Sequence, residues 1–197
     1  ERELTTIYRR QLESVLFSVN QVAQDKSAEV LKIIAEANSD SDPTQMIAQL
    51  SAFNFFHALY RKEIDGEDET VMATNSKFLE GDFWQLAATL AEQNQSTINR
   101  LVRYLEDGDF QKLQSFDEGI NYGGIEIDYQ FFVSKKDGKL FLNIYFFSAV
   151  KFIEQALVPK FQEMAQGDFI ITCKRIKDDF LVYSTSDETA SDIQSEP

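Results

Sequence analysis

The fold is constrained most by two stretches, IEIDYQFFV at residues 125–133 and LFLNIYFF at residues 140–147. In the first stretch apolar and polar side chains alternate, which is the period of a half-buried β-strand. The second stretch is apolar at nearly every position, so we expect both of its faces to be covered. Gly138, in the KKDG sequence between them, can take the positive φ that a tight hairpin turn requires. The two stretches are therefore predicted to form an antiparallel hairpin.

A helix and a second hairpin are expected to follow. Residues 149–164 carry an apolar stripe at three- and four-residue spacing, which predicts an amphipathic helix that covers one face of the second strand. Pro159 should kink or split this helix, and Gly167 should end it. Residues 169–175 and 180–184 are then predicted to be strands. Such a hairpin–helix–hairpin unit can curl a small sheet around a pocket.

The N-terminal part has a helical pattern. Residues 4–37 contain no Gly or Pro and repeat apolar residues at three- and four-residue steps, which predicts one helix of roughly 50 Å. This helix either packs along its own domain or forms a dimer or signalling stalk leaving a membrane. A short helix is expected at 44–50. Residues 53–75 are predicted to form a hairpin, although residues 58–62 would also suit a helix.

The middle of the chain completes an α+β pattern. Helices are expected over residues 82–105, with a break at Ser96-Thr97, and over residues 110–116. Gly123-Gly124 follows no predicted strand and opens no predicted helix, so we do not expect a phosphate-binding loop there. The organisation expected is a long N-terminal, membrane-proximal helix at 1–42, a mixed, mostly helical region at 43–118, a hairpin–helix–hairpin module at 119–185, and a polar linker at 186–197.

Composition and charge limit the classes of partner. The 197 residues are 43% hydrophobic and 13% aromatic, and the formal net charge is −14. A surface this acidic repels nucleic acid, so no nucleic-acid partner is expected. No stretch is apolar over the length of a membrane span. The chain begins Glu-Arg-Glu without Met, from which we expect a piece of a longer protein.

Few residues suggest a catalytic site or a metal site. His57 and Cys173 are the single histidine and the single cysteine; a nucleophilic pair would need them adjacent, and two independent structural residues are the commoner case. One histidine is too few for a histidine-rich zinc site, and the acidic loop at 65–69 lacks calcium-loop spacing. We therefore expect no catalytic group, no metal and no cofactor. The many carboxylates leave a glycosidase-like acid pair open.

Three stretches carry a resemblance to a known class of proteins: FIEQALVPKF at 152–161, DFII at 168–171 and FLVYST at 180–185. With the long N-terminal helix, they resemble the extracytoplasmic sensor regions of bacterial transmembrane histidine kinases, over roughly the last third of the chain. The resemblance implies a PAS/Cache-like α+β fold with helices packed on a small antiparallel sheet. It also implies a periplasmic location, a membrane anchor in the full-length protein, and signalling that depends on a ligand or a partner. We further expect a homodimer, and the lack of a catalytic motif leads us to expect no enzymatic activity in this segment.

The function expected is therefore a signal-sensing domain of a two-component system, responding to a small molecule or a protein. Asn143 among aromatic side chains suits a pocket with few orienting groups. The candidate ligand-binding residues are Tyr129, Phe131, Asn143, Tyr145 and Phe147. The alternative for these aromatics is the core of the domain. The alternatives for the whole chain are a secreted or surface binding module and an extracellular hydrolase.

Overall fold

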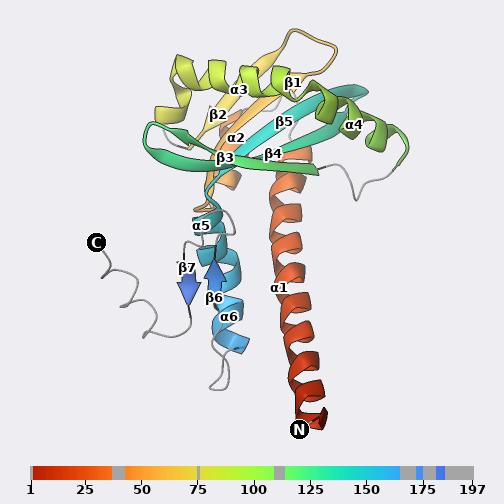
Figure 1. The fold of residues 1–197 in the computed structure, drawn as a ribbon. Coiled ribbons are helices and arrows are strands. Elements are labelled where there is room, and N and C mark those ends of the chain that lie inside the picture. Colours follow the sequence, from red (N-terminus) through yellow and green to blue (C-terminus); the bar gives the residue numbers. More distant parts are fainter. Residues whose placement is uncertain are drawn as a thin grey trace. The chain divides into compact units, whose positions relative to one another are not determined.

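The computed structural model describes residues 2–36, 43–74, 76–108, 114–164, 172–174 and 181–184. It has the expected α+β class, with helices and a small antiparallel sheet (Figure 1). In chain order the elements are α1 (Arg2–Glu36), α2 (Pro43–Leu50), β1 (Phe56–Glu63), β2 (Glu69–Ala73), the 3₁₀ turn η1 (Ser76–Leu79), α3 (Gly81–Gln93), α4 (Gln95–Glu106), β3 (Gln114–Tyr122), β4 (Ile125–Lys136), β5 (Lys139–Phe147), α5 (Ala149–Phe152), the π-helical segment η3 (Ile153–Leu157), α6 (Val158–Met164), β6 (Thr172–Lys174) and β7 (Leu181–Ser184).

The chain divides into two compact units. Residues 29–149 form the first, which we call the sheet unit, and residues 1–28 and 150–197 form the second, which we call the terminal unit. The helix α1 confirms the long N-terminal helix, and its residues are shared between the two units. The short helix expected at 44–50 is also confirmed, as α2.

The sheet unit contains a five-stranded sheet in the order β2-β1-β5-β4-β3, and every neighbouring pair is antiparallel. The predicted hairpin of β4 and β5 is confirmed. Its turn takes positive φ at Asp137 (50°) and Gly138 (82°). The hairpin over residues 53–75 is confirmed as β1 and β2, so the helical alternative at residues 58–62 is wrong.

The strand β3 was not predicted from the sequence. Residues 114–116, expected to be helical, belong to this strand, and residues 110–113 lie outside the described part. Gly123 and Gly124 follow the strand and turn it into β4, with φ of 57° and 82°. β3 is an edge strand with a register shift between Asp117 and Ile120. A bulged edge strand loses the clean alternation by which strands are recognised.

Both faces of the sheet are covered (Figure 1). Helices α3 and α4 cover one face, and α2 with the last turns of α1 covers the other. The prediction that β4 is half-buried is therefore wrong at its centre, where residues 129–134 are all buried. β5 is buried on both faces, as expected, but its cover comes from these helices. The predicted cover, residues 150–164, belongs to the terminal unit.

An aromatic-rich core lies under α3 and α4. Rings from the helices and from the central strands pack edge to face within it. Its buried members are Ala58, Tyr60, Phe78, Phe83, Ala87, Leu90, Ala91, Ile98, Leu101, Ile127, Tyr129, Phe131, Val133, Leu142, Ile144 and Phe146.

The two helices that cover this core meet at Asn94. The break was expected at Ser96-Thr97 but occurs two residues earlier. The Asn94 side-chain amide donates to the carbonyl of Leu90 at 2.9 Å. This local hydrogen bond competes with continuation of the helix. Gln95 therefore begins a new helix beside the end of α3.

The terminal unit has a small core of its own. Ala156, Leu157 and Phe161 are buried against Val19 and Val22 of α1. The expected disturbance near Pro159 is confirmed, because a π-helical segment ends at Leu157, before α6.

The second predicted hairpin is present as β6 and β7, but it forms a separate two-stranded sheet. It does not extend the sheet of β4 and β5. Gly167, the rest of the residues expected in these two strands, and the linker at 186–197 lie outside the described residues.

Phe83 should be among the most sensitive core positions. It is fully buried, and its ring lies 5.0 Å from Phe78, 5.0 Å from Tyr122 and 4.9 Å from Phe146, centroid to centroid. Phe83→Ala should lower the free energy of unfolding by about 3–5 kcal/mol, measured by urea denaturation, because a cavity is left behind. Phe17→Ala, at a side chain that is 71% exposed, should change it by less than about 0.5 kcal/mol. Equal effects of the two substitutions would contradict this account of the core.

Candidate functional site

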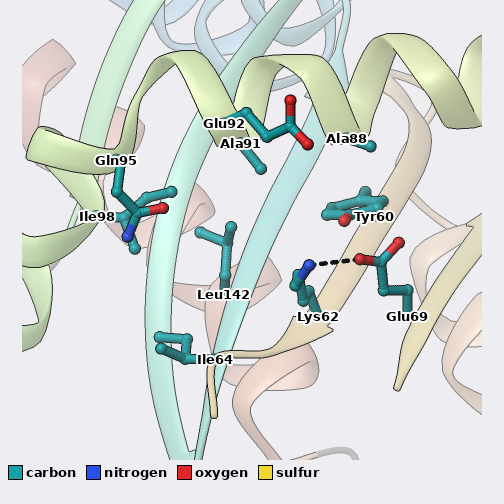
Figure 2. Close-up of a pocket in the computed structure, with 10 residues that line it drawn as sticks. All are labelled: Tyr60, Lys62, Ile64, Glu69, Ala88, Ala91, Glu92, Gln95, Ile98 and Leu142. Atoms are coloured by element: carbon teal, nitrogen blue, oxygen red, sulfur yellow. Dashed lines mark hydrogen bonds and ion pairs between the residues drawn. The ribbon is translucent and has the colours of Figure 1, made fainter. Parts of the chain in front are cut away.

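A small pocket opens between the sheet and the junction of α3 with α4 (Figure 2). Its volume is about 100 Å³, which is enough room for a few ordered water molecules. Ten residues line it: Tyr60, Lys62, Ile64, Glu69, Ala88, Ala91, Glu92, Gln95, Ile98 and Leu142. The pocket therefore suits a ligand of a few atoms, and is smaller than pockets that hold drug-sized molecules.

The local sequence explains why space is left here. Strand alternation in β1 points both Tyr60 and Lys62 toward the helices. On α3 the residues above them are Ala88 and Ala91, whose side chains are too short to fill the gap. Leu142 and neighbouring apolar side chains supply the floor.

The polar wall contains one lysine and two glutamates. The Lys62 Nζ lies 2.5 Å from Glu69 Oε1 across the β1–β2 hairpin. The hydrogen bond from Lys62 is the main reason why the pKa of Glu69 lies below its ordinary value, and burial opposes the shift. Glu92, by contrast, makes no hydrogen bond or ion pair with the described residues. Its charge nevertheless acts on Tyr60.

Tyr60 forms the inner wall of the pocket and is fully buried. Burial, followed by the charge of Glu69, raises the pKa of its phenol far above the ordinary value, so the hydroxyl is neutral at pH 7. Glu69 is near enough to influence this pKa, but the hydroxyl meets no partner among the described residues with the geometry of a hydrogen bond. A buried hydroxyl without such a partner is unusual, and the pocket gives it room to acquire one.

Trp84 lies beside this wall. It is the single tryptophan of the chain and is 37% exposed. Its ring meets that of Tyr60 edge to face, with centroids 6.3 Å apart, and its proximity to Glu69 makes a minor contribution to the lowered pKa of that carboxylate. Its fluorescence should therefore report changes at the pocket wall.

The residue between Tyr60 and Lys62 points to the opposite face of the sheet. Arg61 is 7% exposed, and its Nη2 donates to the carbonyl of Ile34, near the C-terminal end of α1, at 3.2 Å. Its guanidinium carbon lies 4.6 Å from the centre of the Phe141 ring. Carbonyls in the last turn of a helix lack intrahelical partners and attract positive charge, so Arg61 satisfies and stabilises the end of α1. Burial lowers the pKa of Arg61.

The five sequence-predicted binding residues are all buried, and they lie on both faces of the sheet. Tyr129 and Phe131 belong to the core under α3 and α4. In the β4–β5 register Tyr145 is opposite Gln130, not opposite Tyr129. Cross-strand partners share a face, so Asn143, Tyr145 and Phe147 face the other way. None of the five lines the pocket described above.

The Asn143 amide is engaged within the sheet. Its Nδ2 donates to Ser134 Oγ at 3.1 Å and to the carbonyls of Phe132 and Phe141, each at 3.3 Å. Such bonds fix a buried polar side chain in the core. Binding of a ligand by Asn143 stays a prediction.

His57 and Cys173 have separate structural surroundings. His57 belongs to the sheet unit and stacks on Phe78 with centroids 5.2 Å apart. Cys173 packs in the core of the terminal unit, where burial raises the pKa of its thiol. A raised pKa disfavours the reactive thiolate.

The residues that line this pocket were not predicted from the sequence. The alternation of Tyr60 and Lys62 is visible in the sequence, as is the Ala88–Ala91 spacing of small residues on a helix. The contact between α3–α4 and the β1–β2 hairpin is not visible, because no motif in either segment marks which helix packs over which strand.

Comparison with protein-family models, with curated proteins and with solved structures found no match. Over the described residues, no cluster of three or more His, Cys, Asp or Glu side chains could hold a metal ion. Within that same part of the chain, none of the helices combines the length and the apolar character needed to cross a membrane.

The Lys62–Glu69 pair should make stability depend on pH. Because the folded-state pKa of Glu69 lies below its ordinary 4.5, the pair stabilises the fold above pH 4.5 and this contribution is lost as the pH falls through the folded-state pKa. Glu69→Gln should therefore lower the free energy of unfolding by up to about 1 kcal/mol at pH 7, measured by urea denaturation. The difference from wild type should shrink in acid.

Glu67→Gln, at an exposed position of the same hairpin, serves as the matched control and should change stability little at either pH. A deficit of Glu69→Gln that is as large in acid as at pH 7 would show that the carboxylate charge is not its cause.

Proposed function

We propose that this chain is the extracytoplasmic, signal-sensing part of a membrane-anchored sensor histidine kinase and is not itself an enzyme. A small molecule at the α3–α4 pocket, or a protein that contacts the same region, changes the conformation of β1. Strand β1 passes this change to the end of α1. The full-length protein would carry the signal across the inner membrane, as a homodimer, from the periplasmic side.

The observation that supports this proposal most is the arrangement of three consecutive residues in β1. Tyr60 and Lys62 line the pocket on one face of the sheet, and Arg61 holds the carbonyl of Ile34 on the other. A strand is stiff along its backbone, so displacement of Tyr60 and Lys62 also displaces the residue between them. A ligand can shift such an equilibrium only by its difference in affinity for the two conformations.

The sheet also makes a hydrogen bond to Ala149, the first residue of α5. The carboxylate of Asp128, on β4, accepts a hydrogen bond from the backbone N–H of Ala149 at 3.0 Å. An acidic side chain at a helix N-terminus is stabilising, and Ala149 begins α5. The sheet thus holds Ile34 and Ala149, which lie close to the two ends of the sheet unit in the sequence. This suits a unit whose conformation is transmitted elsewhere.

The coding sequence on either side of this segment tests the proposal first. We expect a membrane span before Glu1, and a second span followed by a phosphoacceptor-histidine region and an ATPase domain after Pro197. A stop codon close after Pro197 would contradict the kinase proposal.

The role of Arg61 is tested in the full-length protein. Arg61→Met keeps much of the side-chain volume and removes the donor to Ile34. In membrane vesicles it should change autophosphorylation by about fivefold or more, the lower end of typical coupling energies. Arg103→Met, at an exposed position on α4, should leave it unchanged. Equal autophosphorylation of the two variants, at equal protein levels, would mean that the Arg61 contact does not transmit the signal.

A free-standing binding module is the second candidate, and exposed apolar side chains favour it. Leu79, at the end of η1, is 58% exposed, and Trp84, in the first turns of α3, is 37% exposed. Exposed aromatic and aliphatic residues are common in protein–protein contacts. The downstream coding sequence separates this candidate from the kinase sensor.

A further inference from the structure

We infer that the α3–α4 pocket binds a short organic ammonium ion, with its alkyl group on the apolar floor and its ammonium group between Glu92 and the Tyr60 hydroxyl. This inference rests on the proposed function, because it names the class of ligand that the sensing pocket takes.

The lining favours a cation over an anion. Lys62 is already paired with Glu69, whereas Glu92 has no ion-pair partner among the described residues. The whole chain carries a formal charge of −14, which raises the local concentration of cations and repels anions. An ammonium group beside Glu92 gains an opposite charge at the pocket mouth, and Lys62, the cation of the same lining, is held by Glu69.

The Tyr60 hydroxyl is the second, independent feature. It is buried, neutral, and without a hydrogen bond of adequate geometry in the described part of the chain. A phenol oxygen accepts a hydrogen bond from an ammonium N–H while its own proton remains available to the Glu69 carboxylate. The ligand would therefore satisfy a group that the protein leaves unsatisfied, which lowers the cost of its burial.

Size and polarity limit the rest of the ligand. The pocket holds about 100 Å³, and much of its lining is apolar, with Leu142 and Ile64 below the alanines of α3 and Ile98 of α4 to one side. A chain of two to four carbons suits this floor. A bulkier or doubly charged amine would need the helices to separate from the sheet.

The test is a titration of the 197-residue chain with n-propylammonium chloride at constant ionic strength. The readouts are Trp84 fluorescence and isothermal titration calorimetry. Sodium propionate and 1-propanol are the anionic and neutral ligands of similar size. We expect saturable propylammonium binding in about the millimolar range, as suits a ligand of very few atoms. Propanol should bind more weakly, and propionate should give no saturable signal.

Three substitutions test whether propylammonium binds at this pocket. Glu92→Gln should weaken propylammonium binding by about fivefold, the ratio that corresponds to about 1 kcal/mol for a partly exposed ion pair. Tyr60→Phe should also weaken it. Glu106→Gln removes one negative charge from an exposed position on α4 and should leave the affinity unchanged. Glu92 is exposed, so its substitution should not impair folding, which circular dichroism checks.

Two results would overturn the inference: propionate binding as tightly as propylammonium, or equal affinities of Glu92→Gln and Glu106→Gln for propylammonium. Either failure leaves the proposed function intact, since a pocket of another ligand class could still act through β1. Conversely, propylammonium could bind as expected while the coding sequence after Pro197 encodes no kinase. That result would support the ligand class and contradict the proposed function.

Discussion

The hydrogen bond from the Arg61 guanidinium to the carbonyl of Ile34 is the contact on which the proposed behaviour of this protein depends. A long helix ends against a sheet, and its last carbonyls need donors that the helix cannot supply. Arg61 supplies one from a buried position, braced by the Phe141 ring. A buried arginine that lost this contact would leave both a desolvated charge and an unsatisfied helix end. The helix end and β1 therefore have a strong reason to move together.

Strand alternation turns this contact into a link between two faces. Neighbouring residues of one strand point to opposite sides of a sheet. A displacement of two side chains on one face therefore also moves the residue between them, whose side chain lies on the other face. Here Tyr60 and Lys62 lie at a pocket, and Arg61 lies at a helix end. Both neighbours of β1 in the sheet are paired antiparallel with it, which holds its register while it moves.

Much of the fold could be predicted from the sequence, for reasons that particular residues illustrate. The alternation at 125–133 and the turn at Gly138 specify the β4–β5 hairpin locally, and the long apolar repeat specifies α1. β3 was missed because Gly119 and a bulge interrupt its alternation, and a side chain at Gly119 would crowd Asp128 Oδ1 at 3.2 Å. The pocket depends on which helix packs over which strand, and no local pattern encodes that choice.

The most direct test of the central claim is a double-mutant cycle followed by hydrogen exchange at the amides of residues 33–36. Ala88→Leu fills the pocket, and Arg61→Met removes the link; the four proteins are wild type, both single variants and the double variant. The account predicts that Ala88→Leu alters exchange at the end of α1 when Arg61 is present and has no effect there in the Arg61→Met background. An effect of equal size in both backgrounds, or none in either, would contradict transmission through Arg61.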